Sequence, residues 1–295
     1  MKEWTLSGSI AAAAFAALVG SQLAFAAGPF AHPERVREYD LQVSHKNLVA
    51  ANKEVDADDL AMLKPDGSLA QYPIADFPWH TAEEALNAYP QFLGRVDGID
   101  LPFYYVPAES RKAPVLLLTQ STPGSILQLL ATVDSLTHPA RHGGKAADAY
   151  TVVIAALPGS SFSSLTRSAT SDIATAKLWN ELLTVVIGVP RYQVYGEGLG
   201  AGAMAQLQKL YPRSVSASKA GRPPAAADDQ LLADLLLSRL DQNGMERNMR
   251  LFAGAQTHGD QGFWPNAISN PIVLAKMKVE VSDAIKGKNK GAATE

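Results

Sequence analysis

The chain has 295 residues, of which 47% are hydrophobic and 19% are charged, a composition typical of folded globular proteins. Its 26 basic and 29 acidic residues leave a net charge of −3, which excludes the strongly basic surface that binds nucleic-acid phosphates. There is no cysteine, so disulfides, thiolate nucleophiles and Cys-ligated zinc are excluded. Any chemistry must therefore come from oxygen or nitrogen groups.

Residues 1–26 have the pattern of an export signal. An apolar stretch from Ile10 to Val19 is followed by the small-residue sequence Ala24 to Ala26, which matches the A-x-A site of a cleavable signal. The apolar stretch is short for a membrane span. We therefore expect cleavage after Ala26 and an exported protein, either periplasmic or secreted.

Residues 27–112 are expected to form an N-terminal arm and a hairpin that leads into the core. The first half is polar and irregular, with a turn at Lys64 to Gly67, and it predicts short helices that lie on a larger domain. Thr81, with a glutamate three residues later, has the capping-box pattern and predicts a short helix that ends at Ala88. Two strands, 92–96 and 101–106, then flank Asp97-Gly98, the strongest hairpin signal in the chain.

From residue 113 to 221 the pattern becomes that of an α/β core. Continuous apolar runs are typical of parallel strands that are covered on both faces. The expected strands are 115–118, 152–156 and 192–195, and the expected helices between or after them are 173–186 and 201–211. Alternating strands and helices indicate a mostly parallel sheet with flanking helices.

Residues 222–285 follow this core, and residues 286–295 end the chain. Amphipathic or apolar stretches predict helices at 229–240 and 271–285. The last segment is rich in lysine and glycine, which is typical of a flexible, solvated tail.

Three loops follow the expected strands, at the edge where ligands bind in open parallel sheets. They are Thr119 to Ser125, Leu157 to Ser163 and Tyr195 to Ala201. Together they resemble the landmark segments of epoxide hydrolases of the microsomal and juvenile-hormone type, a branch of the α/β-hydrolase superfamily. Further similar segments are Glu84 to Phe92, Val96 to Asp100, Asp134 to Gly144, Ala147 to Tyr150 and Asn270 to Ala275.

The resemblance covers about residues 75–285 and implies the fold. We expect an incomplete α/β-hydrolase-type, mostly parallel sheet with flanking helices, an N-terminal arm and a partial helical lid over residues 222–285. In this family the catalytic acid and the base histidine lie in strands beyond the lid. Because the chain stops at Glu295, the resemblance implies that it is truncated at the C-terminus and lacks both groups.

The family attacks an epoxide carbon with an aspartate, and a histidine-activated water then hydrolyses the resulting ester. An elbow nucleophile needs small residues two positions before and after it. Gly196 and Gly200 meet this requirement only if the nucleophile position is 198, and that residue is Gly198. Glu197 is an alternative carboxylate, but neither residue flanking its own frame is small.

Other parts of the family site are also altered. The first loop has Gln120-Ser121 where the family has His-Gly, yet the backbone N–H groups of Thr122 and Leu199 would still form an oxyanion-type pocket. The residues expected to line the pocket are Gln120, Phe162 and Phe252. His258 resembles part of a lid segment and is the alternative base, with a solvated loop histidine as the simpler interpretation.

These observations favour an exported, catalytically degenerate epoxide-hydrolase-like protein that binds a small apolar ligand or a partner. The first alternative is an active epoxide hydrolase with a non-standard nucleophile, or one complemented by a second chain. The alternative from another class is a nucleotide-binding protein that uses the Gly196 and Gly198 loop, although no acid follows about 20 residues later. We expect no nucleic acid, cofactor or metal, and a homo-oligomer or second subunit would cover the open sheet edge.

Overall fold

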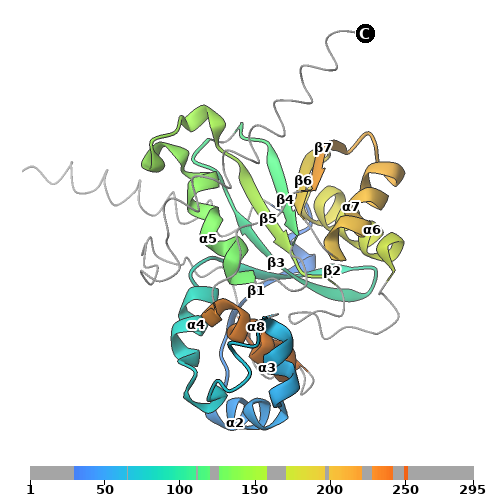
Figure 1. The fold of residues 1–295 in the computed structure, drawn as a ribbon. Coiled ribbons are helices and arrows are strands. Elements are labelled where there is room, and N and C mark those ends of the chain that lie inside the picture. The colour runs from blue at the N-terminus through green and yellow to red at the C-terminus, as the bar shows by residue number, and fades with distance from the viewer. Residues whose placement is uncertain are drawn as a thin grey trace, which may run out of the picture.

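The computed structural model of the chain describes residues 30–64, 66–110, 112–119, 126–157, 171–196, 199–220, 228–241 and 249–251. Within these ranges, one mixed sheet has the strand order β7-β6-β4-β5-β3-β2-β1-β8 (Figure 1). The strands are β1 Val36–Leu41, β2 Gln91–Val96, β3 Ile99–Val106, β4 Val115–Thr119, β5 Thr151–Ala155, β6 Tyr192–Gly196, β7 Val215–Ala220 and β8 Met249–Leu251. β5, β4, β6 and β7 are parallel, and the remaining strands pair antiparallel from β5 outward. The three strands predicted for the parallel core are confirmed.

Helices cover both faces of the sheet. They are α2 His45–Glu54, α3 Ala57–Leu63, α4 Trp79–Leu86, α5 Ile126–Thr137, α6 Asp172–Glu181, α7 Leu199–Leu210 and α8 Asp228–Asp241. Short 3-10 turns lie at Pro33–Arg35, Ile74–Asp76, Pro139–His142 and Ala146–Asp148. One buried cluster joins α4, α5 and α8 to the sheet, and a second joins α6 and α7 to the opposite face. The predicted α/β class with flanking helices is therefore confirmed.

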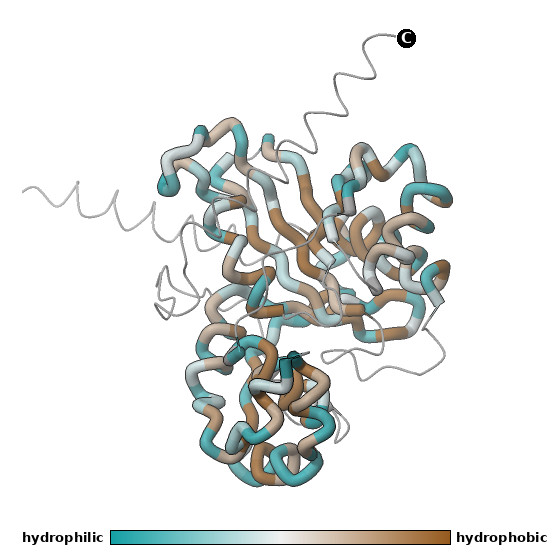
Figure 2. Tube along the Cα trace, viewed as in Figure 1, coloured by the Kyte–Doolittle hydropathy of each residue, from teal (hydrophilic) through white to brown (hydrophobic). Residues whose placement is uncertain are grey.

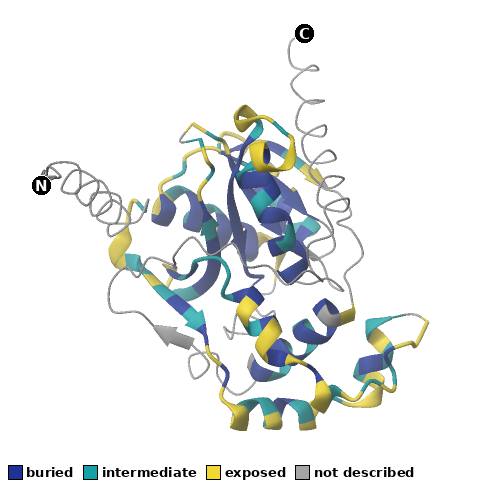
Figure 3. Ribbon diagram, turned by 90° about the vertical axis from the view of Figure 1, so that its left-hand side faces the viewer, coloured by how far each residue is buried: buried dark blue, intermediate teal, exposed yellow. Residues whose placement is uncertain are grey.

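The central strands are apolar on both faces because both faces are covered. Leu116 and Leu118 of β4 belong to the first cluster, whereas Leu117 between them belongs to the second. All three side chains are fully buried. Figure 2 shows the apolar centres of these strands, and Figure 3 shows the buried sheet beneath more exposed helices. This alternation explains why the run in the sequence is continuous rather than periodic.

The predicted hairpin is confirmed. β2 and β3 pair in register from Val96 opposite Ile99 back to Gln91 opposite Tyr104. Asp97 and Gly98 both have positive φ, +46° and +77°, which is the backbone conformation of a two-residue type I′ turn. The local sequence alone thus determines the register of this pair.

The predicted start of the helix that precedes this hairpin is wrong. α4 begins at Trp79 with Pro78 at its N-cap, and no side chain caps it. Trp79 is 2% exposed, and burying so large an apolar ring contributes more than the roughly 1 kcal/mol of a capping box at Thr81. The helix also ends at Leu86 rather than at Ala88.

The N-terminal arm contains a strand as well as the short helices predicted for it. β1 pairs with β2 and adds the arm to the sheet. Only Tyr39 and Leu41 of this strand are buried, so its sequence lacks a clear apolar alternation. The predicted turn after α3 is present, with the Gly67 amide donating to the Lys64 carbonyl at 3.0 Å.

The helix predicted at 173–186 changes its geometry along its length. α6 ends at Glu181, and a π-helix follows over Leu182–Ile187. Gly188 ends it at φ +87°, with Ala31 so close that an added Cβ would lie 2.6 Å from the alanine Cβ. α5 and β7 were not predicted, because α5 is buried nearly all round and β7 has a mixed, small-residue sequence.

α8 lies with α2, α3 and α4 at one end of the molecule (Figure 1). Arg239 on α8 donates to Asp59 of α3 at 2.5 Å, and Lys64 pairs with Asp228. The assignment of residues 222–285 to a partial lid stays a prediction. The signal at 1–26, the helix at 271–285 and the tail at 286–295 lie outside the described residues. Among the helices that are described, none has the length and apolar character needed to cross a membrane.

Candidate functional site

The junction between β6 and α7 forms the centre of the candidate site. β6 ends at Gly196 and α7 begins at Leu199, so only two residues connect them. The turn lies at the carboxyl edge of the parallel strands, where β4 also ends. A strand that turns into a helix within two residues is the architecture that exposes a nucleophile in α/β-hydrolases.

Close contact between β4 and β6 explains the glycine before the turn. Gly196 is paired with Thr119, the last residue of β4. A Cβ at position 196 would lie 1.8 Å from Thr119 Oγ1 and 2.8 Å from the Thr119 carbonyl oxygen. Thr119 is itself buried, and its hydroxyl contacts Met204 Sδ of α7 at 3.5 Å. The position therefore accepts only glycine without displacement of β4.

Two further glycines lie in the first turn of α7. Gly200 is buried, which agrees with the small residue required two positions after the elbow. A Cβ at Gly202 would lie 2.0 Å from the Asp172 carboxylate, which belongs to the first turn of α6. The beginnings of α6 and α7 are thus packed together beside the elbow.

The structure tests few of the side chains predicted for the site. Leu199 is the first residue of α7, so its amide is one of those that lack an acceptor within the helix, as an oxyanion donor must. The other predicted residues are Gln120, Thr122, Phe162, Glu197, Gly198, Phe252 and His258, and all of them lie outside the described residues. Their roles stay predictions.

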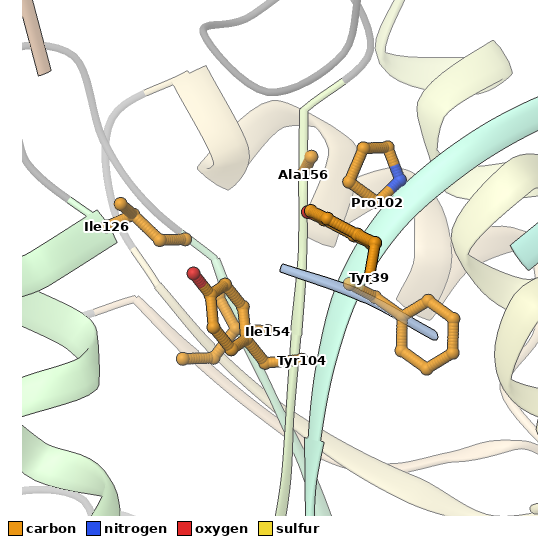
Figure 4. Close-up of a pocket in the computed structure, with 7 residues that line it drawn as sticks. Tyr39, Pro102, Tyr104, Ile126, Ile154 and Ala156 are labelled. Carbon is orange, nitrogen blue, oxygen red and sulfur yellow. The ribbon is translucent and has the colours of Figure 1, made fainter. Parts of the chain in front are cut away.

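A small apolar recess lies at the same carboxyl edge, beside the end of β5 (Figure 4). Its walls come from β1, β3, the first residue of α5 and the end of β5. The lining residues are Tyr39, Pro102, Phe103, Tyr104, Ile126, Ile154 and Ala156. The volume open to the centre of a water molecule is about 10 Å³, which corresponds to space for about one water molecule.

Of the described residues that line this recess, Tyr39 and Tyr104 are the two with a side-chain hydroxyl. The Tyr104 hydroxyl donates to the Leu86 carbonyl at 3.1 Å. The Tyr39 hydroxyl has no hydrogen-bond partner among the described residues, although the side chain is 1% exposed. Burial raises the pKa of both hydroxyls above the usual value, and for Tyr104 the neighbouring Tyr39 and Asp234 add to the increase in pKa. Both groups are therefore neutral and can donate hydrogen bonds at physiological pH.

The sequence did not reveal these tyrosines as site residues. Tyr39 lies in a polar segment, and Tyr104 lies in the predicted hairpin with no motif around it. They meet because β1 pairs with β2, which in turn pairs with β3. No local signal in the sequence reports that order of strands.

A cluster of charged residues lies at the opposite edge of the sheet. Asp134 accepts from His142 Nε2 at 2.6 Å and lies 3.4 Å from His138 Nδ1 and 3.5 Å from Arg141. α5 runs from the end of β4 to the start of β5, so its last turn and this cluster are distant from the elbow. These contacts stabilise the 3-10 turn after α5. The cluster does not contribute a base to the candidate site.

No metal site emerges from the described ranges, where no three histidine, aspartate or glutamate side chains are grouped so that they could hold an ion. The elbow and the recess offer backbone donors, tyrosine hydroxyls and apolar walls. Such a set suits a small apolar ligand that carries a hydrogen-bond acceptor.

Comparisons with known proteins place these features in a family context. Residues 36–129 match the family model "Epoxide hydrolase N terminus". A relative named "Putative epoxide hydrolase" from Stigmatella aurantiaca is 33% identical over 149 residues, which are 50% of this chain and 34% of that protein. Epoxide hydrolase 1 of Oryctolagus cuniculus is 26% identical over 145 residues, 48% of this chain and 32% of that protein.

A solved structure supports the same relationship at the level of the fold. The crystal structure of juvenile hormone epoxide hydrolase from the silkworm Bombyx mori matches with a TM-score of 0.50 and 17% identity. The match covers 64% of this chain and 53% of the silkworm chain. The resemblance to epoxide hydrolases and the α/β-hydrolase fold are thus confirmed, whereas the chain spans about a third of the length of the curated relatives it matches.

Proposed function

We propose that this epoxide-hydrolase-like protein binds a small apolar molecule at the carboxyl edge of its parallel strands and does not hydrolyse epoxides. The observation that carries the proposal is the combination at the elbow. β6 ends at Gly196, α7 begins at Leu199, and closely packed glycines lie on both sides of this junction, as a nucleophile elbow requires. The position that the frame assigns to the nucleophile is nevertheless Gly198.

A glycine at this position removes the first covalent step. Opening an epoxide by this route needs a carboxylate that attacks the ring carbon and forms an ester. Gly198 has no side chain, and using Glu197 instead would place Tyr195 where the elbow requires a small residue. Tyr195 is 3% exposed, so the packing around its side chain leaves no room for a turn shifted by one residue.

Binding does not need the nucleophile. The apolar recess beside β5 and the backbone amide of Leu199 at the start of α7 are independent of the side chain at 198. An apolar ligand with one oxygen would gain from burial of its hydrocarbon part and from hydrogen bonds to its oxygen.

Turnover of styrene oxide tests this proposal. The purified chain should form the diol no faster than a heat-denatured sample. A Glu197→Gln variant is the control for the alternative nucleophile. Diol formation that the parent chain catalyses and that Glu197→Gln abolishes would establish an active hydrolase with a shifted elbow and would refute the proposal.

We also propose that the protein is exported, on the basis of the apolar stretch and the small-residue site at Ala24 to Ala26. An exported binding protein with no cysteine does not depend on disulfide formation in an oxidising compartment.

A further inference from the structure

The first described residues of the chain are docked on the end of a helix. The amide of Ala31 donates to the Ile187 carbonyl at 3.2 Å, and the amide of His32 donates to the Val186 carbonyl at 3.1 Å. Both carbonyls belong to the last turn of the π-helix after α6, where backbone acceptors lack partners within the helix. The segment Phe30 to His32 therefore caps this helix end, and we call it the N-terminal clip.

An aromatic side chain anchors the N-terminal clip on the sheet. The Phe30 ring lies edge-to-face against Phe92 of β2, with 5.0 Å between the ring centroids. It meets Phe103 and Tyr105 of β3 in the same way, at 5.9 and 5.4 Å. Contacts of this geometry stabilise aromatic pairs beyond the burial of their area. A side chain thus holds the clip in addition to its two backbone hydrogen bonds.

The chain is also held tightly on the C-terminal side of the clip. Gly188 ends the π-helix so close to the clip that an added Cβ would lie 2.6 Å from the Ala31 Cβ. Arg35 pairs with Glu181 of α6 at 3.4 Å, and β1 begins at the next residue, Val36. Little free chain therefore follows the clip before the sheet.

Three residues separate the clip from the proposed signal-cleavage site. Cleavage after Ala26 leaves Ala27, Gly28 and Pro29 before Phe30. Because a fully extended chain spans at most about 3.6 Å per residue, Ala27 lies within roughly 11 Å of Phe30. A protease that binds its substrate as an extended strand needs free chain on both sides of the bond it cuts. A docked clip therefore brings the folded body against the peptidase.

We infer that the leader is removed before the N-terminal clip docks, and that the chain is exported unfolded by a translocase and a signal peptidase that act on unfolded chains. In the cleavage step water adds across the Ala26–Ala27 peptide bond, so the leader gains a carboxylate and the mature chain gains an amino group. Residues 1–26 contain no arginine, so the twin-arginine type of export signal is absent from them. This inference rests on the proposed export and deepens it, since it names the state in which the chain is exported.

The test follows cleavage of the purified full-length precursor by a bacterial signal peptidase in detergent, with intact mass as the readout. The folded precursor should be cleaved about tenfold or more slowly than the same chain held unfolded in urea that the peptidase tolerates, because cleavage then depends on the small population with an undocked clip. A spacer of glycine and serine between Pro29 and Phe30, about eight residues long, adds roughly 28 Å of reach. It should restore rapid cleavage of the folded chain.

A substitution in the clip supplies an independent measurement. Phe30→Ala removes the aromatic anchor, so cleavage of the folded precursor should accelerate toward the rate of the spacer variant. Tyr72→Ala is the matched control, because it removes a partly buried ring that packs against the cluster on the opposite face of the sheet. Its cleavage rate should equal that of the parent. If Phe30→Ala does not fold, the spacer variant decides the question.

The outcomes separate the role of the clip from export itself. A folded parent cleaved as fast as the unfolded chain, a spacer variant as slow as the parent, or equal acceleration by Phe30→Ala and Tyr72→Ala would overturn the inference while leaving export intact. An unfolded chain that is never cleaved after Ala26 would instead overturn the proposed export, and the inference with it.

Discussion

Replacing Gly196 with alanine tests whether the elbow depends on close contact between β4 and β6. The added Cβ would lie 1.8 Å from Thr119 Oγ1, 2.8 Å from the Thr119 carbonyl oxygen and 3.0 Å from Thr119 Cβ. Two of these atoms belong to the buried side chain of Thr119 and one to its backbone, which pairs with β6, so none can move without disturbing β4. Overpacking of this kind costs about 1–3 kcal/mol.

Urea unfolding of the parent, Gly196→Ala, Thr119→Ala and the double variant measures this cost and its origin. Part of it should disappear when Thr119→Ala removes the hydroxyl, giving a coupling free energy of about 1 kcal/mol, while the contact with the carbonyl oxygen remains. Gly202→Ala is the matched control, because its clash is with the end of the exposed Asp172 side chain, which can rotate away. A Gly196→Ala variant as stable as Gly202→Ala, or a cost unaffected by residue 119, would refute the packing argument.

Three further predictions concern the tyrosines and the N-terminus. Tyr104→Phe should lower the free energy of unfolding by about 1 kcal/mol because the Leu86 carbonyl loses its donor. Tyr39→Phe removes no hydrogen bond between described residues and should change the free energy of unfolding by less than about 0.5 kcal/mol. Equal effects in urea unfolding would contradict the different roles of the two hydroxyls. Burial raises the pKa of the Tyr39 and Tyr104 hydroxyls, so the folded state retains protons that the unfolded state releases. Stability should therefore be constant below about pH 10 and fall above it, by about 1.4 kcal/mol per pH unit for each such tyrosine; an equally steep fall in Tyr104→Phe would show that other groups are responsible. For export, the intact mass of the protein from its native host should lack residues 1–26, and recovery of the full-length chain in the cytoplasm would contradict the prediction.

Sequence reasoning succeeded where the structure is determined locally. The Asp97-Gly98 turn has backbone preferences that two residues determine, and the structure has both positive φ values. The run at Val115 to Thr119 is apolar on both faces, as a strand at the centre of a covered sheet must be. The glycine spacing around position 198 predicted a nucleophile elbow there; β6 ends at Gly196 and α7 begins at Leu199, and the elbow itself stays a prediction.

It failed where distant parts of the chain decide the outcome. The burial of Trp79 starts α4 two residues before the capping-box threonine. The strand Val36–Leu41 is too polar to be recognised alone and forms because β2 offers it an edge. Tyr39 reaches the recess only through that pairing, so its place in the lining had no signal in the sequence.

The most direct test of the central claim, that the elbow remains as architecture without its nucleophile, is a Gly198→Asp variant. If the turn between Gly196 and Leu199 is a nucleophile elbow, the new carboxylate should attack styrene oxide and form an ester, with the oxygen of the opened ring taking up a proton. Mass spectrometry should then show one added styrene oxide on the peptide that contains residue 198, and none on that peptide in the parent. A folded variant that is never labelled there would contradict the account, because the position would then not face a ligand site.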